Sequence, residues 1–160
     1  MPRYKGTSMI NNDVLRSLRY MLKTDDTAIA AMIALGGGQT TRAEVTSFLL
    51  RDDEPGYTVC DNKVMASFLD GLIIQRRGPK DGPPRAVEKG VTNNTVLKKL
   101  RVAFELKEDD LISLMAASGF EVSKPELSAL FRNPEHKNFR PAGDQFLRNF
   151  LKALTARIRA

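Results

Sequence analysis

The chain contains a single cysteine, no tryptophan and no long hydrophobic run. One thiol, Cys60, cannot close a disulfide within the chain and is too few for a zinc or iron–sulfur site. The longest apolar stretch, residues 28–35, has eight residues, whereas a membrane-spanning helix needs roughly 18 or more. The chain also begins without the apolar segment of a signal peptide. These absences predict a cytoplasmic protein without a metal, a cofactor or membrane contact.

The composition is that of a folded protein with a basic excess. A chain of 160 residues with 42% hydrophobic and 28% charged residues is typical of one domain or two very small ones. Its 25 Lys and Arg against 19 Asp and Glu give a net charge of +6. A positive excess indicates nucleic acid or another acidic surface as a partner.

The sequence repeats itself at an offset of 82 residues. Residues 11–19 align with residues 93–101 with six identities in nine positions, and the offset continues without a gap to residues 72 and 154. Such self-similarity predicts a duplicated fold. The predicted organisation is an extension (1–10), a first unit (11–72), a linker (73–92), a second unit (93–154) and a tail (155–160).

Each unit is predicted to form four helices and no strands, which makes the fold all-α. In the first helix an apolar stripe begins at Val14, and Asn12 is placed to cap the preceding turn. Capping-box sequences, Thr41-x-x-Glu44 and its counterpart Ser123-x-x-Glu126, predict the start of both third helices. Because helical units this small need a neighbour to bury their apolar surface, we expect the two units to dock as a pseudo-twofold pair.

The repeat divides the charge unevenly. The first unit carries −3 and the second +2, whereas the extension, linker and tail carry +2, +3 and +2. Most of the basic excess therefore lies outside the two units. The charge supports nucleic-acid binding less strongly than the whole-chain value suggests.

The sequence offers no convincing catalytic or metal site. His136 has Asp144 eight residues later, but no nucleophile motif accompanies the pair, so a loop-bracing histidine is favoured. The glycines at 36–38 lack the Lys-Ser/Thr ending of a phosphate-binding loop and are interpreted as a helix stop. The carboxylates at 25–26 and 108–110 each open a predicted helix, where they favour its positive end. We therefore expect a binding protein rather than an enzyme.

Residues suited to binding a macromolecule occur in two regions. The first helices carry cations opposite their apolar stripes: Arg16, Arg19, Lys98 and Arg101. The last helix of the second unit and the loop before it carry the densest polar cluster: His136, Lys137, Arg140, Gln145, Arg148 and Asn149. This cluster either forms a binding surface that the first unit has lost in becoming a scaffold, or braces the loop and the contact between units.

These clusters lead to two functional hypotheses. The first is weak binding of nucleic-acid phosphates by Arg16, Arg19, Lys98, Arg101, Arg140 and Arg148, without strong sequence preference. The second is a protein-interaction adaptor that uses the loop and last helix of the second unit. The partner is left undecided between nucleic acid and another protein, and homodimerisation is left open.

Five segments carry motifs that occur together in a known family: residues 9–20, 52–57, 126–132, 136–140 and 143–151. They resemble the bacterial YehS-like family, a duplicated domain of unknown function. The resemblance covers about residues 9–154 and is most specific in the run Gly143 to Leu151. It implies a small bacterial cytoplasmic protein and carries over no catalytic residue. The chain departs from the family pattern at the three glycines 36–38.

Overall fold

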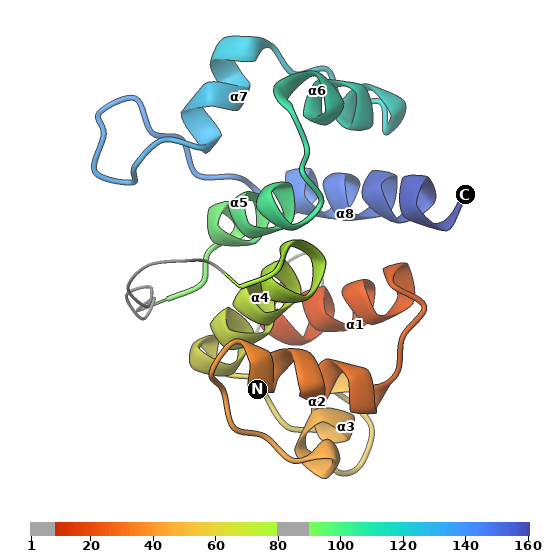
Figure 1. The fold of residues 1–160 in the computed structure, drawn as a ribbon. Coiled ribbons are helices and arrows are strands. Elements are labelled where there is room, and N and C mark those ends of the chain that lie inside the picture. Colours follow the sequence, from red (N-terminus) through yellow and green to blue (C-terminus); the bar gives the residue numbers. More distant parts are fainter. Residues whose placement is uncertain (1–8, 80–89) are drawn as a thin grey trace. The chain divides into compact units, whose positions relative to one another are not determined.

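The two predicted repeats fold as two compact units. The computed structural model describes residues 9–79 and 90–160, in which every regular element is a helix (Figure 1). The chain divides into a first repeat, Ile10–Val91, and a second repeat that begins at Thr92. The all-α prediction with four helices per repeat is confirmed, and docking of the repeats stays a prediction. The helices are α1 (Asn11–Met21), α2 (Asp26–Leu35), α3 (Arg42–Leu49), α4 (Asn62–Arg77), α5 (Asn93–Ala103), α6 (Glu108–Ala117), α7 (Lys124–Leu130) and α8 (Asp144–Arg159).

The last helix of each repeat extends beyond the predicted end of its repeat unit. Helix α4 continues past residue 72 because Ile73 is buried, and it ends at Arg77, since the φ of 84° at Gly78 no longer fits a helix. Helix α8 likewise continues to Arg159, through the predicted tail. The predicted linker therefore begins inside α4, and its residues 80–89 lie outside the described part of the chain, as do residues 1–8 of the predicted extension.

The predicted capping boxes are confirmed. The Thr41 hydroxyl accepts from the Glu44 N–H at 3.1 Å, and Glu44 Oε1 accepts from the Thr41 N–H at 2.9 Å. Ser123 and Glu126 form the same reciprocal pair at 3.2 Å in both directions. Each box satisfies N–H groups that the helix itself leaves without partners.

The predicted capping role of Asn12 is wrong. Helix α1 follows Ile10, whose N–H donates to Asp13 Oδ2 at 3.2 Å. Asn12 occupies the second helical position and is fully buried, because its side chain lies on the inner face of α1 against the chain that connects α3 to α4. Its side-chain amide forms hydrogen bonds there and does not cap the helix.

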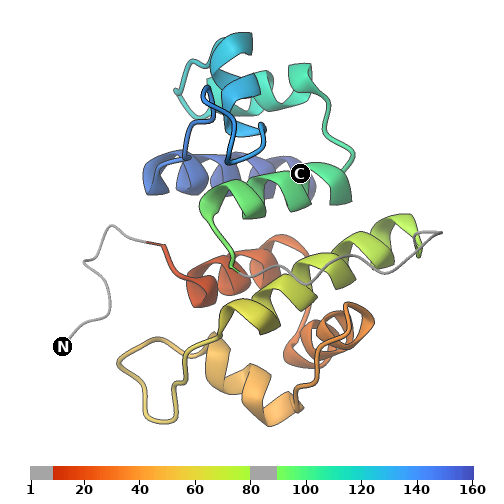
Figure 2. The same ribbon diagram turned by 90° about the vertical axis from the view of Figure 1, so that its left-hand side faces the viewer.

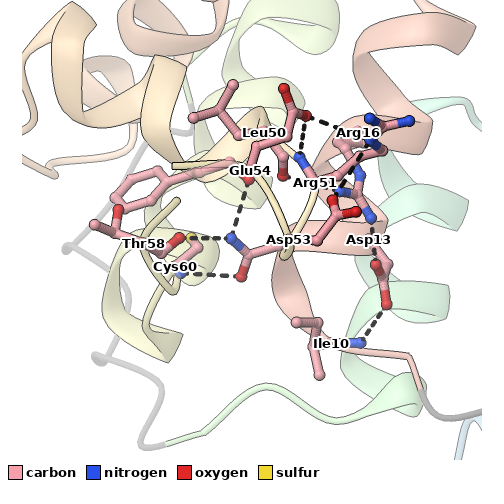
Figure 3. Close-up of polar contacts among 11 residues, drawn as sticks. Ile10, Asp13, Arg16, Leu50, Arg51, Asp53, Glu54, Thr58 and Cys60 are labelled. Carbon is pink, nitrogen blue, oxygen red and sulfur yellow. Dashed lines mark hydrogen bonds and ion pairs between the residues drawn. The ribbon is translucent and has the colours of Figure 1, made fainter. Parts of the chain in front are cut away.

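The side chain of Asn12 makes three hydrogen bonds to the backbone, one at the end of α3 and two in the α3–α4 connection. Its Nδ2 donates to the carbonyl oxygens of Phe48 at 3.0 Å and Thr58 at 2.9 Å. Its Oδ1 accepts from the Cys60 N–H at 3.0 Å (Figure 3). One buried side chain thus satisfies a carbonyl in the last turn of α3 and two backbone groups of the connection that follows, which has no regular structure of its own. We call this arrangement the asparagine clamp.

The second repeat contains the same clamp, 82 residues later. Asn94 Nδ2 donates to the carbonyl oxygens of Leu130 at 2.8 Å and Arg140 at 2.9 Å. Asn94 Oδ1 accepts from the Ala142 N–H at 2.8 Å. All four positions are the counterparts of those in the first repeat, so the clamp belongs to the repeat fold.

The apolar stripes close the core around the clamps. In the first repeat Val14, Leu15 and Leu18 of α1 are buried, as are Phe68 and Leu69 of α4. In the second repeat the equivalent stripes are buried on α5 and α8. The period of these stripes correctly predicted which faces of the helices point inward.

Two glycines bring α2 and α4 unusually close together. A Cβ atom on Gly71 would lie 1.7 Å from the Met32 carbonyl oxygen, and one on Gly36 would lie 1.8 Å from the Ser67 carbonyl oxygen. Neither position can therefore hold a side chain. The second repeat has Ser118 and Ala153 at the equivalent positions, so α6 and α8 cannot approach in this way. The close crossing explains why one of the three glycines at 36–38 is needed.

Gly71→Ala is expected to lower the free energy of unfolding by about 1–3 kcal/mol, because the added methyl group would overpack the crossing. Helix propensity alone predicts the opposite, a gain of about 1 kcal/mol. The matched variant Ala153→Gly tests propensity without a crossing and should cost about 1 kcal/mol. Urea denaturation of the three proteins measures both effects. A stabilised Gly71→Ala would disprove the close contact.

Candidate binding grooves

The second repeat contains a groove beside the loop before α8. It has a volume of about 320 Å³ and is bordered by the α6–α7 connection, α7 and the start of α8. Its apolar wall includes Phe120 and Phe146, whose rings meet edge to face with centroids 5.5 Å apart. Its polar residues are Glu126, Arg140 and Gln145. A mixed lining of this size suits one or two side chains of a bound segment.

The first repeat has a groove at the equivalent place, with a volume of about 720 Å³. Nine of its lining residues are the counterparts, at the offset of 82, of residues that line the second groove. The shared positions are Gly38 and Phe120, Thr40 and Val122, Glu44 and Glu126, Phe48 and Leu130, Thr58 and Arg140, Val59 and Pro141, Asp61 and Gly143, Lys63 and Gln145, and Val64 and Phe146. The groove is therefore a property of the repeat fold.

The asparagine clamp holds one wall of each groove. In the second repeat it fixes the carbonyls of Leu130 and Arg140, both of which line the groove. In the first repeat it fixes Phe48 and Thr58 in the same way. The loops themselves project from their repeats, as Figure 1 shows for α7–α8 and Figure 2 for α3–α4. The clamp thus ties this wall to the first helix of the repeat.

A second tie from α1 holds the loop of the first repeat. Arg16 donates to the Leu50 carbonyl at 2.9 Å and pairs with Asp13 at 2.6 Å (Figure 3). At the base of the loop, Asn11 Nδ2 donates to the Cys60 carbonyl and to Asn62 Oδ1 at 3.1 and 3.0 Å. Asn93 repeats the latter arrangement in the second repeat, donating to the Ala142 carbonyl and to Asp144 Oδ1.

Three of the four cations predicted on the first helices are engaged within their own repeats. Besides Arg16, Arg19 pairs with Asp26 at 3.1 Å. Arg101 donates to the Leu106 carbonyl at 3.1 Å and lies 4.7 Å from the centre of the Phe131 ring. Lys98 is exposed and has no polar partner among the described residues. These contacts give the three arginines a structural role. They leave few unpaired positive charges on the outer faces of α1 and α5.

The predicted cluster of the second repeat divides into two groups. Arg140 and Gln145 line the groove, and Gln145 also donates to Asn149 at 3.1 Å. His136 and Lys137 are exposed on the loop, and Arg148 is half-buried on α8. His136 Nδ1 accepts from the Asn138 N–H at 3.0 Å, which makes it the loop brace that the sequence favoured. Asp144 Oδ1 accepts a hydrogen bond from Asn93. His136 and Asp144 are not hydrogen-bonded to each other among the described residues, so they do not form an acid–base pair there.

Hydrogen bonds keep the groove carboxylate of the second repeat ionised. The Ser123 hydroxyl and N–H donate to Glu126 and lower the pKa of that carboxyl group, and the charge of nearby Arg140 adds to the effect. Glu126 thus serves the capping box and also gives the groove a fixed negative charge. Arg140 supplies the opposite charge on the same rim.

The described residues offer little for metal or thiol chemistry. Within residues 9–79 and 90–160 there is no group of three or more His, Cys, Asp or Glu side chains that could hold a metal ion. Burial raises the pKa of the Cys60 thiol to about 12, with a contribution from Asp61. A thiol in that state is a poor nucleophile at neutral pH. None of the helices in these same residues is long and apolar enough to span a membrane.

The fold and the grooves together define a duplicated four-helix repeat protein with a surface groove at the equivalent place in each repeat. The chain belongs to the family described as "Protein of unknown function (DUF1456)", whose model matches residues 11–78 and again 93–160. It is also 45% identical over 150 residues to the uncharacterised protein YehS of Escherichia coli (strain K12), covering 93% of this chain and 96% of the relative. The resemblance noted in the sequence is confirmed. No solved structure matches the chain.

Sequence reasoning missed the clamp and the grooves. A buried asparagine next to a helix start has the same sequence pattern as a helix cap, so the pattern alone cannot separate the two roles. One signal was present: the pair Asn11-Asn12 recurs unchanged as Asn93-Asn94, whereas the next position differs between Asp13 and Thr95. The grooves carry no such signal, because their walls come from segments that only the tertiary fold brings together.

Asn12→Asp is expected to lower the free energy of unfolding by about 3 kcal/mol, because it leaves one buried and one part-buried carbonyl without a donor. The carboxylate keeps the size of the side chain but would face the carbonyl oxygens of Phe48 and Thr58. Asn94→Asp should act alike in the second repeat. Chemical denaturation, followed by circular dichroism, measures both losses.

Thr40→Val is the matched control. The Thr40 hydroxyl is buried and has no hydrogen-bond partner among the described residues, so its removal should leave the stability unchanged or raise it by about 1 kcal/mol. If Asn12→Asp is as stable as Thr40→Val, the clamp does not hold the loop.

Proposed function

We propose that this protein is a polypeptide-binding adaptor, in which the groove of the second repeat accepts an extended segment of another protein. The observation that carries this proposal is the groove itself, with apolar and charged groups at its edge. Its apolar wall, formed by Phe120, Phe146 and Pro141 among others, offers a place for an apolar side chain. The volume of about 320 Å³ fits a short segment rather than a folded surface.

The charged side chains of the groove indicate that the bound segment also contains an acidic residue. The Arg140 side chain is exposed and has no hydrogen-bond partner in the described part of the chain. Glu126 Oε1, in contrast, already accepts two hydrogen bonds, from the N–H and the hydroxyl of Ser123. Arg140 is therefore the freer of the two charges, and it would pair with an acidic residue next to the apolar side chain of the segment. The exposed loop residues His136 and Lys137 extend the same surface.

Binding of nucleic-acid phosphates has less support. Arg16, Arg19 and Arg101 make internal contacts, and a groove that carries the carboxylate of Glu126 beside Arg140 does not favour a polyanion. We also propose that the protein is not an enzyme, which is supported by the inert environment of Cys60 and the loop-bracing contact of His136. The relative from Escherichia coli supports a bacterial source, and the single cysteine of the chain supports the cytoplasmic location that we propose.

Photocrosslinking tests the adaptor proposal. A benzophenone amino acid placed at position 145 should crosslink to a protein in nuclease-treated Escherichia coli lysate. Sequencing of the adduct should find an apolar residue beside an acidic one. Arg140→Glu should reduce the adduct about tenfold, equivalent to about 1.4 kcal/mol. The matched control position is Ala116, which is exposed on α6 and outside the groove.

Three results would overturn the proposal. They are equal crosslinking from positions 145 and 116, an adduct that survives Arg140→Glu undiminished, and an adduct that contains nucleic acid and forms only in parallel lysate without nuclease. The third result would favour the phosphate-binding hypothesis instead.

A further inference from the structure

The groove of the first repeat is a second candidate site with a different chemistry. At the positions of Phe120 and Phe146 it has Gly38 and Val64. The ring pair that occupies part of the second groove therefore has no counterpart, which is consistent with the larger volume of about 720 Å³. The larger groove gives no support to the alternative in which the first repeat has lost its binding surface and become a scaffold.

The lining of the first groove is rich in groups that form hydrogen bonds. The Ser47 hydroxyl donates to the Glu44 carbonyl and bonds to the Thr58 hydroxyl. The side chains of Gln39 and Ser67 have no hydrogen-bond partner among the described residues. Such a wall favours a polar, extended ligand, because each unsatisfied group can gain a partner on binding.

The charges in the first groove are mostly negative. Glu44 and Asp61 both line it and both are exposed. Each uses one oxygen for a helix cap: Glu44 Oε1 accepts from Thr41, and Asp61 Oδ1 accepts from Val64. The other oxygen of each carboxylate has no partner in residues 9–79 or 90–160. Lys63 is the one cation of the lining, so the charged side chains of the groove sum to −1. Residues 10–79, which include Arg76 and Arg77 at the end of α4, also carry a net charge of −1.

We infer that the first groove is a second polypeptide-binding site, selective for a polar segment with a basic side chain that pairs with Glu44 and Asp61. The Lys63 ammonium group would donate to the backbone carbonyls of that segment. The inference rests on the proposed function, because it assumes that the repeat fold uses its groove for polypeptide. It deepens that function by making the chain bivalent, with the two sites separated by the sign of the charge that they select.

Short labelled peptides test the inference on the full chain. One alternates serine and lysine, the second alternates serine and glutamate, and the third alternates leucine and glutamate. In ¹⁵N-labelled protein the serine–lysine peptide should shift the amide signals of Thr40, Ser47 and Val64, all in the first groove. The leucine–glutamate peptide should shift signals of the second groove, and the serine–glutamate peptide should leave the first groove unperturbed.

Charge-neutral variants make the test specific. Glu44→Gln with Asp61→Asn keeps an acceptor oxygen for both caps and removes the two groove charges, so affinity for the serine–lysine peptide should fall about five- to tenfold. A matched double variant, Asp25→Asn with Asp53→Asn, removes two exposed charges of the same repeat outside the groove. It controls for the general attraction of a basic peptide to an acidic repeat and should bind normally.

Equal weakening by the two double variants would overturn the inference, and so would binding of the serine–glutamate peptide in the first groove. Loss of the crosslink from position 145 while the serine–lysine peptide still binds would overturn the adaptor proposal for the second groove alone. A crosslink from position 145 without binding of the serine–lysine peptide would overturn only the inference of a site in the first groove.

Discussion

One buried asparagine in each repeat holds together the part of the molecule that has no regular structure. Asn12 and Asn94 each bond one carbonyl oxygen at the end of the third helix of their repeat, and one carbonyl oxygen and one N–H of the connection that follows it. Backbone polar groups that leave water without a partner are costly, so a long connection cannot pack against a helix unless something satisfies them. The clamp meets this requirement with a single side chain, and it thereby fixes a wall of each groove.

The duplication has kept the clamp and changed what surrounds it. In the first repeat Gly36 and Gly71 allow a close crossing of α2 and α4, and Gly38 leaves the groove open. In the second repeat larger residues stand at these positions, and the Phe120–Phe146 ring pair narrows the groove. The backbone arrangement that makes a groove is thus common to both repeats, whereas the side chains that select a ligand are not. This pattern is what two sites of different specificity on one chain would require.

The sequence predicted the fold more fully than the site. Apolar periodicity and reciprocal caps depend on residues close together in the chain, so the four helices of each repeat and the boxes at Thr41 and Ser123 could be predicted. Helix ends depend on tertiary burial, which is why Ile73 carries α4 beyond the predicted unit. The arginines of α1 and α5 looked like a solvent-facing basic surface, because sequence spacing cannot show that Asp26 or the Phe131 ring lies within reach.

Native-state hydrogen exchange at two amides tests the central claim most directly. The N–H groups of Cys60 and Ala142 donate to the clamp asparagines and lie outside every helix. If the clamp organises each repeat, these two amides exchange as slowly as those of Leu18 and Leu100 in the helical core, and only through unfolding of their repeat. Exchange at the rate of exposed loop amides, such as those of Asp53 and Lys137, would contradict it.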